Sequence, residues 1–391
     1  MGSYTGVLKR PGVARMLLSQ LAARWAFGMM SLAFVIHIQK VTDSYAIAGI
    51  ALGAETLGAA ISGPVQGRLI PRFGPRRIVL TTALIGAAAM VFIGAIEGPA
   101  WLLVLLGLVV GLTSPPIQQI VRPIYPSLIK KSQTNYLFAL DANLQEIIWV
   151  VGPIVATLIA ANLGTDIGLY VMAGVQVAGC FWFALNPEVR SSKIEPSKRR
   201  MGGVLKSRIV FSNMLMGLLL VGSFGGAEVG TVAAIPDRNV SGLVLAALSL
   251  GSLVGGFAFG HRIKTKYALT KFFALLLFGY GLIFISPTDP LWVGVCWFIA
   301  GLGVAPVFAT LAGIIAVKLN AAESTEAYGW IGTGQLVGYS GAAAVAGIII
   351  DNVSAVASFS VSILCAALGL IVAILSLPFT PTPLSNESSK S

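Results

Sequence analysis

Five charged side chains fall inside long apolar runs of this sequence, where a charge is costly. They are Arg24, Glu55, Asp141, Glu146 and Glu228. A charge at the centre of a bilayer costs about 2.5–3.5 kcal/mol on insertion scales, and such residues usually face a cavity or a partner. At about 1.5 Å per helical residue, Arg24, Glu55 and Glu146 lie roughly 13–18 Å into their runs, near the midplane. These residues are the first candidates for ligand binding and proton transfer.

The four acids are candidates for carrying protons, because a buried carboxylate with no cation nearby can take and release a proton near neutrality. Asp141 and Gln145 are four residues apart and share one helix face, whereas Glu146 diverges from Asp141 by about 140°. We therefore expect Asp141 to face a cavity with Gln145, and Glu146 to face a neighbouring helix. Glu228 fits a cavity or an outer gate contact equally well.

Arg24 and three glutamines are candidates for lining a substrate cavity: Arg24, Gln118, Gln145 and Gln335. Gln118 follows Pro115-Pro116, and Gln335 lies in a glycine-rich run. Proline pairs and glycines expose backbone polar groups, which is tolerated only toward a cavity or packed protein. The structural alternatives are a fixed ion pair between Arg24 and one of the acids, and ordinary interhelical hydrogen bonds for the glutamines.

The composition excludes a soluble domain. Of 391 residues, 56% are hydrophobic and 10% are charged, whereas soluble domains carry about 25% charged residues. The net charge of +11 arises from a few basic loops, so we do not expect nucleic acid as a partner. Three separated cysteines and two histidines predict no disulfide framework and no metal site. The sequence contains no P-loop and no hydrolase motif, so we do not expect an enzyme.

Twelve apolar runs are long enough to cross a bilayer as helices, which takes about 20 mostly apolar residues. The runs are 14–39, 44–70, 77–97, 100–125, 134–162, 166–187, 208–235, 238–260, 268–286, 289–316, 325–350 and 354–378. Of 26 Lys and Arg residues, all but Arg24, Lys40 and Arg238 precede the first run, follow the last, or lie at alternate connections. Basic short loops stay cytoplasmic, so we expect an inner-membrane protein with both termini in the cytoplasm.

The longest polar segment inside the chain separates six runs from six. We predict an N-terminal six-helix bundle over 1–187, a cytoplasmic linker over 188–207, a C-terminal six-helix bundle over 208–380 and a disordered tail over 381–391. The expected fold is an all-α membrane protein of 12 transmembrane helices, in two six-helix bundles related by pseudo-two-fold symmetry.

A weak internal repeat supports this division into halves. A shift of 193 residues aligns three glycines of the second run with three of the eighth: Gly58, Gly63 and Gly67 with Gly251, Gly256 and Gly260. A basic loop follows in both copies.

The loop between the second and third runs carries the most specific motif. The segment 63–77 reads GPVQGRLIPRFGPRR and holds four arginines. It resembles the G-x-x-x-D-R-x-G-R-R loop between helices 2 and 3 of major facilitator superfamily transporters at five positions: Gly67, Arg72, Gly74, Arg76 and Arg77. Two positions depart from that pattern, because Pro71 replaces the usual acid and Pro75 a common basic residue.

A second resemblance lies in the fifth run, where Gly152-Pro153 matches a G-P pair of the superfamily's antiporters, although Ala156 and Thr157 depart from what usually follows. The arginine that the family commonly carries midway along helix 4 is missing from residues 102–121. The family resemblance implies two bundles around a central cavity, alternating access, a monomer without cofactors, and a conformational switch at the 63–77 loop.

From these observations we predict a secondary transporter that exports a small organic compound, drug-like or sugar-like, in exchange for protons. Its partners would be that substrate, protons and the lipid bilayer. One alternative is a proton-coupled importer of a nutrient or organic anion, which Arg24 favours if no acid pairs with it. The other is a membrane sensor of the same fold that transports nothing.

Overall fold

The computed structural model describes residues 4–130, 133–192, 202–235, 238–259 and 265–379. These residues form helices and short connections, with no strand among them. The first half consists of α1 (Tyr4–Leu8), α2 (Val13–Thr42), α3 (Tyr45–Phe73), α4 (Pro75–Ala95), α5 (Ala100–Leu112), α6 (Ile117–Leu128), α7 (Thr134–Asn162), α8 (Thr165–Leu185) and α9 (Pro187–Ser191).

The second half follows a linker of which residues 193–201 lie outside the described ranges. It consists of η2 (Gly203–Lys206), α10 (Arg208–Ala234), α11 (Arg238–Phe259), α12 (Ala268–Gly281), η4 (Leu282–Ile285), α13 (Pro290–Lys318), α14 (Ala321–Asn352) and α15 (Ala355–Ser376). Across both halves, twelve helical segments of the described chain are long and apolar enough to cross a membrane. The predicted disordered tail, 381–391, lies outside the described residues.

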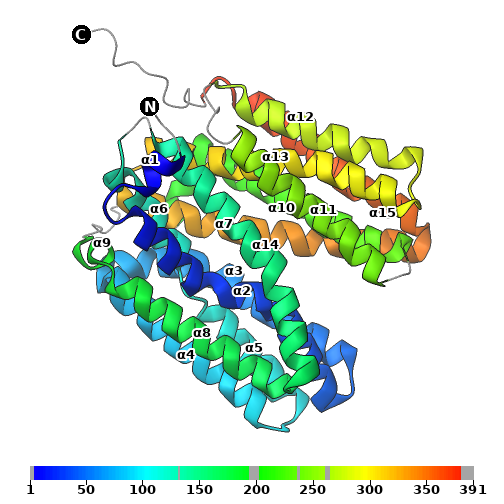
Figure 1. Ribbon diagram of the computed structural model, residues 1–391, viewed down its shortest axis with the longest axis horizontal. Helices are drawn as coiled ribbons and strands as arrows, with labels where there is room; N and C mark the ends of the chain where they lie inside the picture. Colours follow the sequence, from blue (N-terminus) through cyan, green and yellow to red (C-terminus); the bar gives the residue numbers. More distant parts are fainter. Residues whose placement is uncertain (1–3, 131–132, 193–201, 236–237, 260–264, 380–391) are drawn as a thin grey trace.

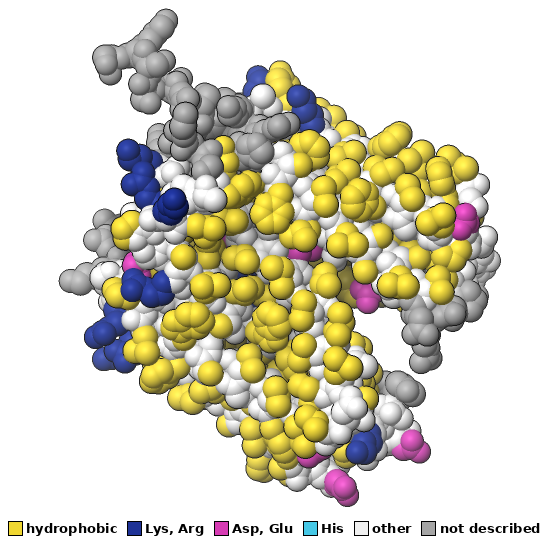
Figure 2. Space-filling view, in the orientation of Figure 1, with side chains coloured by type: hydrophobic (Ala, Val, Ile, Leu, Met, Phe, Trp, Pro, Cys, Tyr) yellow, Lys and Arg dark blue, Asp and Glu magenta, His cyan; other side chains and the backbone are white. Residues whose placement is uncertain are grey.

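The two halves touch at one end of the molecule and separate at the other (Figure 1). At the closed end, which carries α1, α9 and η2, a buried apolar cluster combines Ile70 and Phe138 of the first half with Ile315 and Tyr328 of the second. Two further clusters each belong to a single half. At the open end the surface is hollowed between the halves, and basic side chains gather mostly toward the closed end (Figure 2).

A proline pair divides the fourth span into α5 and α6. Pro115-Pro116 cannot donate backbone hydrogen bonds within a helix, so carbonyl groups of the preceding turn lose their helical partners. The Gln66 side chain of α3 donates to two carbonyls at the break, those of Leu112 (3.3 Å) and Ser114 (3.0 Å). The break is therefore satisfied inside the protein, as the bilayer requires.

Small residues set the contact between the halves at the closed end. A Cβ on Gly63 of α3 would lie 2.8 Å from the carbonyl oxygen of Gly329 in α14, and one on Gly67 would lie 3.0 Å from the Glu326 Cα. Thr333 of α14 also donates a hydrogen bond to the Ala60 carbonyl. Glycines permit this backbone approach, and it brings the charged ends of α3 and α14 together.

Candidate functional site

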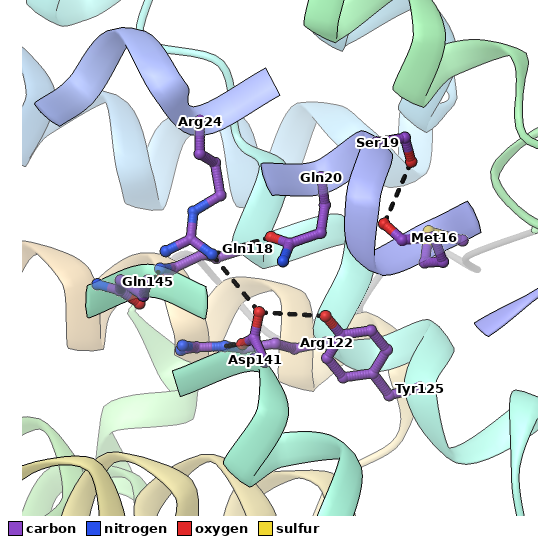
Figure 3. A network of polar contacts seen from close by, with 9 residues as sticks. All are labelled: Met16, Ser19, Gln20, Arg24, Gln118, Arg122, Tyr125, Asp141 and Gln145. Carbon is purple, nitrogen blue, oxygen red and sulfur yellow. Dashed lines mark hydrogen bonds and ion pairs between the residues drawn. The ribbon is translucent and has the colours of Figure 1, made fainter. Parts of the chain in front are cut away.

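Three helices of the first half, α2, α6 and α7, bring a buried polar network together (Figure 3). Asp141 of α7 lies at its centre and accepts from Arg24 Nη1 (3.5 Å), Arg122 Nε (3.2 Å) and the Tyr125 hydroxyl (3.1 Å). Arg24 also donates to Gln20 Oε1 at 2.9 Å. Asp141 thus faces two cations and a hydroxyl rather than open water.

This network holds more positive than negative charge. Arg24 is 4% exposed, Arg122 7% and Asp141 1%, so all three groups are withdrawn from solvent. Within the described residues, neither arginine has an ion pair with any acid other than Asp141. Among the described residues, one carboxylate is therefore shared by two buried guanidinium groups, and the network contains one more basic than acidic side chain.

Arg122 also connects the two halves. Its guanidinium lies 5.5 Å from the centroid of the Tyr328 ring in α14, a cation–π distance. The Tyr328 hydroxyl donates to the Ala312 carbonyl of α13 at 2.8 Å, which holds the ring in place. The network is thus covered from the second half by an aromatic side chain.

The glutamine candidates divide between two places. Gln118 Nε2 of α6 donates to Gln145 Oε1 of α7 at 3.1 Å, and both side chains lie beside Arg24 and Asp141 (Figure 3). Gln335 is not part of this site. It packs over Gly217 of α10, and a Cβ on Gly217 would lie 3.4 Å from Gln335 Nε2. Asp141 itself is fully engaged with its cations, instead of pairing with Gln145.

Glu55 lies in a different environment from Asp141. It is 7% exposed, and the adjacent Thr56 hydroxyl donates to its Oε2 at 3.4 Å. No cation of the described chain forms an ion pair with it. The Glu55 backbone packs closely against Gly111 of α5, so this carboxylate is held inside the first half.

Two side chains of α7 face α11 of the second half. Glu146 lies beside Ser252 of α11. Asn143 is 2% exposed, its amide lies directly against Gly256 of α11, and among the described residues neither amide atom has a hydrogen-bond partner. The contact between α7 and α11 therefore includes buried polar side chains.

Glu228 is the remaining acid candidate, and it lies within the second half. Its Oε2 accepts a hydrogen bond from the Tyr339 hydroxyl of α14 at 2.6 Å, with Glu228 exposed. The contact joins α10 to α14 and belongs to neither the Asp141 network nor Glu55.

The segment 63–77 was predicted as a loop, but residues 63–73 form the last turns of α3 and only Gly74 separates them from α4. The segment meets the second half through a residue outside the five that match the motif. Arg68 Nε lies 2.8 Å from Glu326 Oε2 of α14, and the Glu326 side chain is fully buried. Glu326 Oε1 accepts a hydrogen bond from the Gly202 N–H of the linker at 2.8 Å. We call these three residues, Arg68, Glu326 and Gly202, the clasp, because they join α3, α14 and the linker.

The five motif positions take different roles around the clasp. Gly67 packs against the Glu326 backbone, and Gly74 adopts a left-handed φ of 83° between α3 and α4, a conformation that glycine tolerates. The three motif arginines are exposed and have no ion pair in the described part of the chain: Arg72, Arg76 and Arg77.

The antiporter-like pair lies where α7 crosses α2. A Cβ on Gly152 would lie 2.6 Å from the Gly28 Cα, so the two backbones touch at this point. The side chain of Pro153 lies outside the description. Gly152 therefore has a packing role, one that brings Arg24 of α2 near Asp141 of α7.

Three residues of these contacts were not predicted as site residues from the sequence: Arg122, Tyr328 and Glu326. All three lie near the ends of apolar runs, where a charged or aromatic side chain is usually interfacial. Only weak features of the sequence could have pointed to these residues. Apolar residues precede Arg122, and Glu326 is the acid directly before Ala327-Tyr328. The packing of α14 against α6 and α3 buries them.

A metal or cofactor has no obvious place among these residues. Within the described ranges, no three His, Cys, Asp or Glu side chains gather into a group that could hold a metal ion. The absence of cofactors stays a prediction.

Comparison with known families identifies the chain as a membrane transporter. The family model described as Major Facilitator Superfamily matches residues 16–338. An uncharacterized MFS-type transporter of Sinorhizobium fredii is 25% identical over 285 residues, which cover 67% of this chain and 69% of that protein. The multidrug resistance protein MdtG of Citrobacter koseri is 22% identical over 175 residues, 44% of this chain and 43% of that protein.

Solved structures share the fold along nearly the whole chain. A bacterial homologue of the iron transporter ferroportin, in its outward-facing state, has a TM-score of 0.76 at 15% identity and covers 93% of this chain and 98% of its own. The Major Facilitator Superfamily transporter FucP, in the outward conformation, has a TM-score of 0.71 at 14% identity with the same coverage. Similarity of the sequence and of the fold agrees, and the chain belongs to the major facilitator superfamily, whose members are transporters rather than enzymes.

Proposed function

We propose that this protein exports a small organic compound, drug-like or sugar-like, in exchange for protons and by alternating access. The observation that carries the proposal is Glu55: a buried carboxylate with no cation of the described chain beside it. Burying an unpaired anion is costly, and taking up a proton removes that cost. Glu55 is therefore the acid best suited to carry a proton through the protein.

The other acids are less suited to that role. Asp141 is held by two arginines, and its carboxylate is engaged as their ion-pair partner. Glu228 is exposed and bonded to Tyr339. Glu146, beside Ser252 between the halves, is the second candidate, because a change in the contact of α7 with α11 would alter its surroundings.

Sidedness follows from charge. Lys and Arg gather toward the closed end (Figure 2), and basic loops remain cytoplasmic. We therefore place the closed end and both termini in the cytoplasm of an inner membrane, with the cavity facing outward in this conformation. The clasp would hold that cytoplasmic end shut and release when the cavity turns inward.

Export is favoured over import by two sequence similarities. One is the match to a relative that is named a multidrug resistance protein, and the other is the Gly152-Pro153 pair. Import of a nutrient or organic anion is the second candidate function. Import was favoured on the condition that Arg24 has no acid partner. Arg24 instead pairs with Asp141.

The test is substrate-driven proton movement in proteoliposomes of one orientation, with a panel of antibiotics, dyes and sugars. Wild type is compared with Glu55→Gln and Glu146→Gln, and Glu97→Gln, an exposed loop acid, is the matched control. We expect at least one compound to drive protons in the direction opposite to itself, and Glu55→Gln to abolish this coupling.

Other outcomes separate the alternatives. Protons that move in the same direction as the compound would indicate an importer or symporter. Binding without any flux would favour the sensor that transports nothing. Coupling that survives in Glu55→Gln but is lost in Glu146→Gln would transfer the proton role to Glu146.

A further inference from the structure

The proposed proton pathway does not involve the two buried arginines beneath Tyr328. Arg24 and Arg122 share a single carboxylate, that of Asp141, and both are nearly inaccessible to solvent. A buried charge without a counter-ion is strongly destabilising. A structural clamp between helices would need one arginine for one acid, so the second arginine requires another explanation.

The network also contains polar groups without partners. Gln20 is 0% exposed and its Nε2 has no hydrogen-bond partner in the described part of the chain, while its Oε1 accepts from Arg24. Gln118 and Gln145 are bonded to each other beside the same arginine (Figure 3). The site with the surplus positive charge therefore also contains one hydrogen-bond donor, Gln20 Nε2, and two amide side chains that can bind a ligand if they exchange partners.

The cover over the surplus charge comes from the other half of the molecule. Tyr328 is the aromatic ring over Arg122, and α14, which carries it, meets the first half through Gly63 and the clasp. If α14 separated from α3 and α6, the ring would leave Arg122. The guanidinium would then face the opened end while still sharing the Asp141 carboxylate with Arg24.

We propose that the Arg24–Arg122–Asp141 network is an anion-binding site, and that the compound this protein carries is a singly charged organic anion, such as a carboxylate. The inference rests on the proposed transport function and names its substrate class. Arg122 would bind the carboxylate directly, since guanidinium groups bind carboxylates through charge-assisted hydrogen bonds, and Gln20 Nε2 supplies a further donor.

The same geometry gives a means of release. An anion and the Tyr328 ring compete for Arg122, so closure of the cytoplasmic end returns the ring and weakens the anion's hold. The anion would therefore bind when the cytoplasmic end is open and leave when the cavity faces outward. One bound anionic charge neutralises the network, whereas a neutral compound would leave the surplus charge buried.

The test is ligand-dependent thermal unfolding of the purified full-length protein in detergent at pH 7, because a ligand that binds only the folded state stabilises it. Three acids are each compared with the neutral amide of the same shape: benzoate with benzamide, salicylate with salicylamide, and nicotinate with nicotinamide. We expect a saturable rise in unfolding temperature with at least one acid and none with its amide.

Variants locate the site. Arg122→Gln should raise the acid concentration for the half-maximal shift about tenfold or more, the loss of one charge-assisted contact, while Arg122→Lys keeps part of the effect. Arg190→Gln, an exposed arginine of α9, is the matched control. Tyr328→Leu should lower the half-maximal concentration because it uncovers Arg122, and Tyr328→Phe, which keeps the ring, should lower it less.

The proposal is wrong if no acid stabilises the wild type, if an amide stabilises it as well as its acid, or if Arg122→Gln responds like Arg190→Gln. Detergent solution holds no proton gradient, so these results do not depend on Glu55. Failure of proton coupling in liposomes with intact acid binding would overturn the proposed antiport and leave the anion site standing. Tyr328→Leu also reports on the site where Arg122→Gln fails to fold.

Discussion

At the scale of single residues, the two kinds of buried acid differ in what surrounds them. Asp141 is the counter-ion of two buried arginines, whereas Glu55 has a hydroxyl neighbour and no ion pair in the described chain. Asp141 is therefore part of an ion-pair network, whereas Glu55 is the acid that we propose for proton transfer. Their neutral amide variants should separate these roles.

Asp141→Asn should destabilise the protein strongly. Removing the carboxylate leaves two buried guanidinium groups without a counter-ion, and breaking a buried pair in this way costs about 3–5 kcal/mol. Thermal unfolding in detergent measures the effect, and Glu55→Gln should unfold near the wild-type temperature. The double variant Asp141→Asn, Arg24→Gln should recover part of the loss; an Asp141→Asn protein as stable as Glu55→Gln would contradict this assignment.

At the scale of helices, crossings made by glycine decide which side chains meet. The crossing of α2 and α7 at Gly28 and Gly152 aligns Arg24 with Asp141, and the crossing of α3 and α14 at Gly63 and Gly329 closes one end of the molecule. Both depend on the absence of a Cβ. Each crossing gives a separate prediction.

Gly152→Ala should lower stability by about 1–3 kcal/mol, the usual cost of overpacking, because its Cβ would meet the Gly28 backbone. Gly174→Ala in α8, where a Cβ meets nothing within 4 Å, is the control. Thermal unfolding of the two variants side by side gives the comparison. Equal unfolding temperatures would mean that α2 and α7 are less closely packed than described.

Gly63→Leu should force α3 and α14 apart and favour the conformation that is open at the basic end. Spin labels on cysteines at Arg72 and Lys318, both exposed near that end, would report the distance between the halves in a background without native cysteines. We expect longer distances for Gly63→Leu. Gly53→Leu, on the same helix with nothing within 4 Å of its Cβ, should leave the distances as in wild type.

At the scale of the whole molecule, the clasp links the first half, the second half and the linker at one buried carboxylate, that of Glu326. Breaking it should change the balance between the two conformations more than it changes the stability of either half. Because Arg68 and not the motif arginines reaches Glu326, the variants of this loop should differ among themselves.

Arg68→Gln should shift the balance toward the form that is open at the basic end. A hydrogen bond to a charged group contributes about 1.5–3 kcal/mol, so we expect a change of roughly tenfold or more in the ratio of the two forms. The same spin-label pair measures it on the Arg68→Gln background. Arg77→Gln, an exposed arginine without an ion pair in the described chain, should have little effect; an equal shift from both would assign the switch to loop charge instead of to the clasp.

Much of the architecture was predictable because the bilayer imposes it. Twelve spans and the family followed from run lengths, loop charge and the 63–77 motif, since a helix must satisfy its own backbone in lipid and basic loops stay on one side. Arg24 and Asp141 could be chosen as candidates because a charge in an apolar run is costly. These conclusions needed no knowledge of which helices are neighbours.

The partners of those residues came only from the tertiary structure. Run lengths cannot tell that α6 packs against α14, so Arg122 and Tyr328 were not expected to meet, and Arg68 could not be distinguished from the other arginines of its loop. The cost of each charge is a property of one helix in lipid, which the sequence determines. The pairing that compensates it depends on distances between helices far apart in the chain, and only the folded arrangement of the two halves decides those.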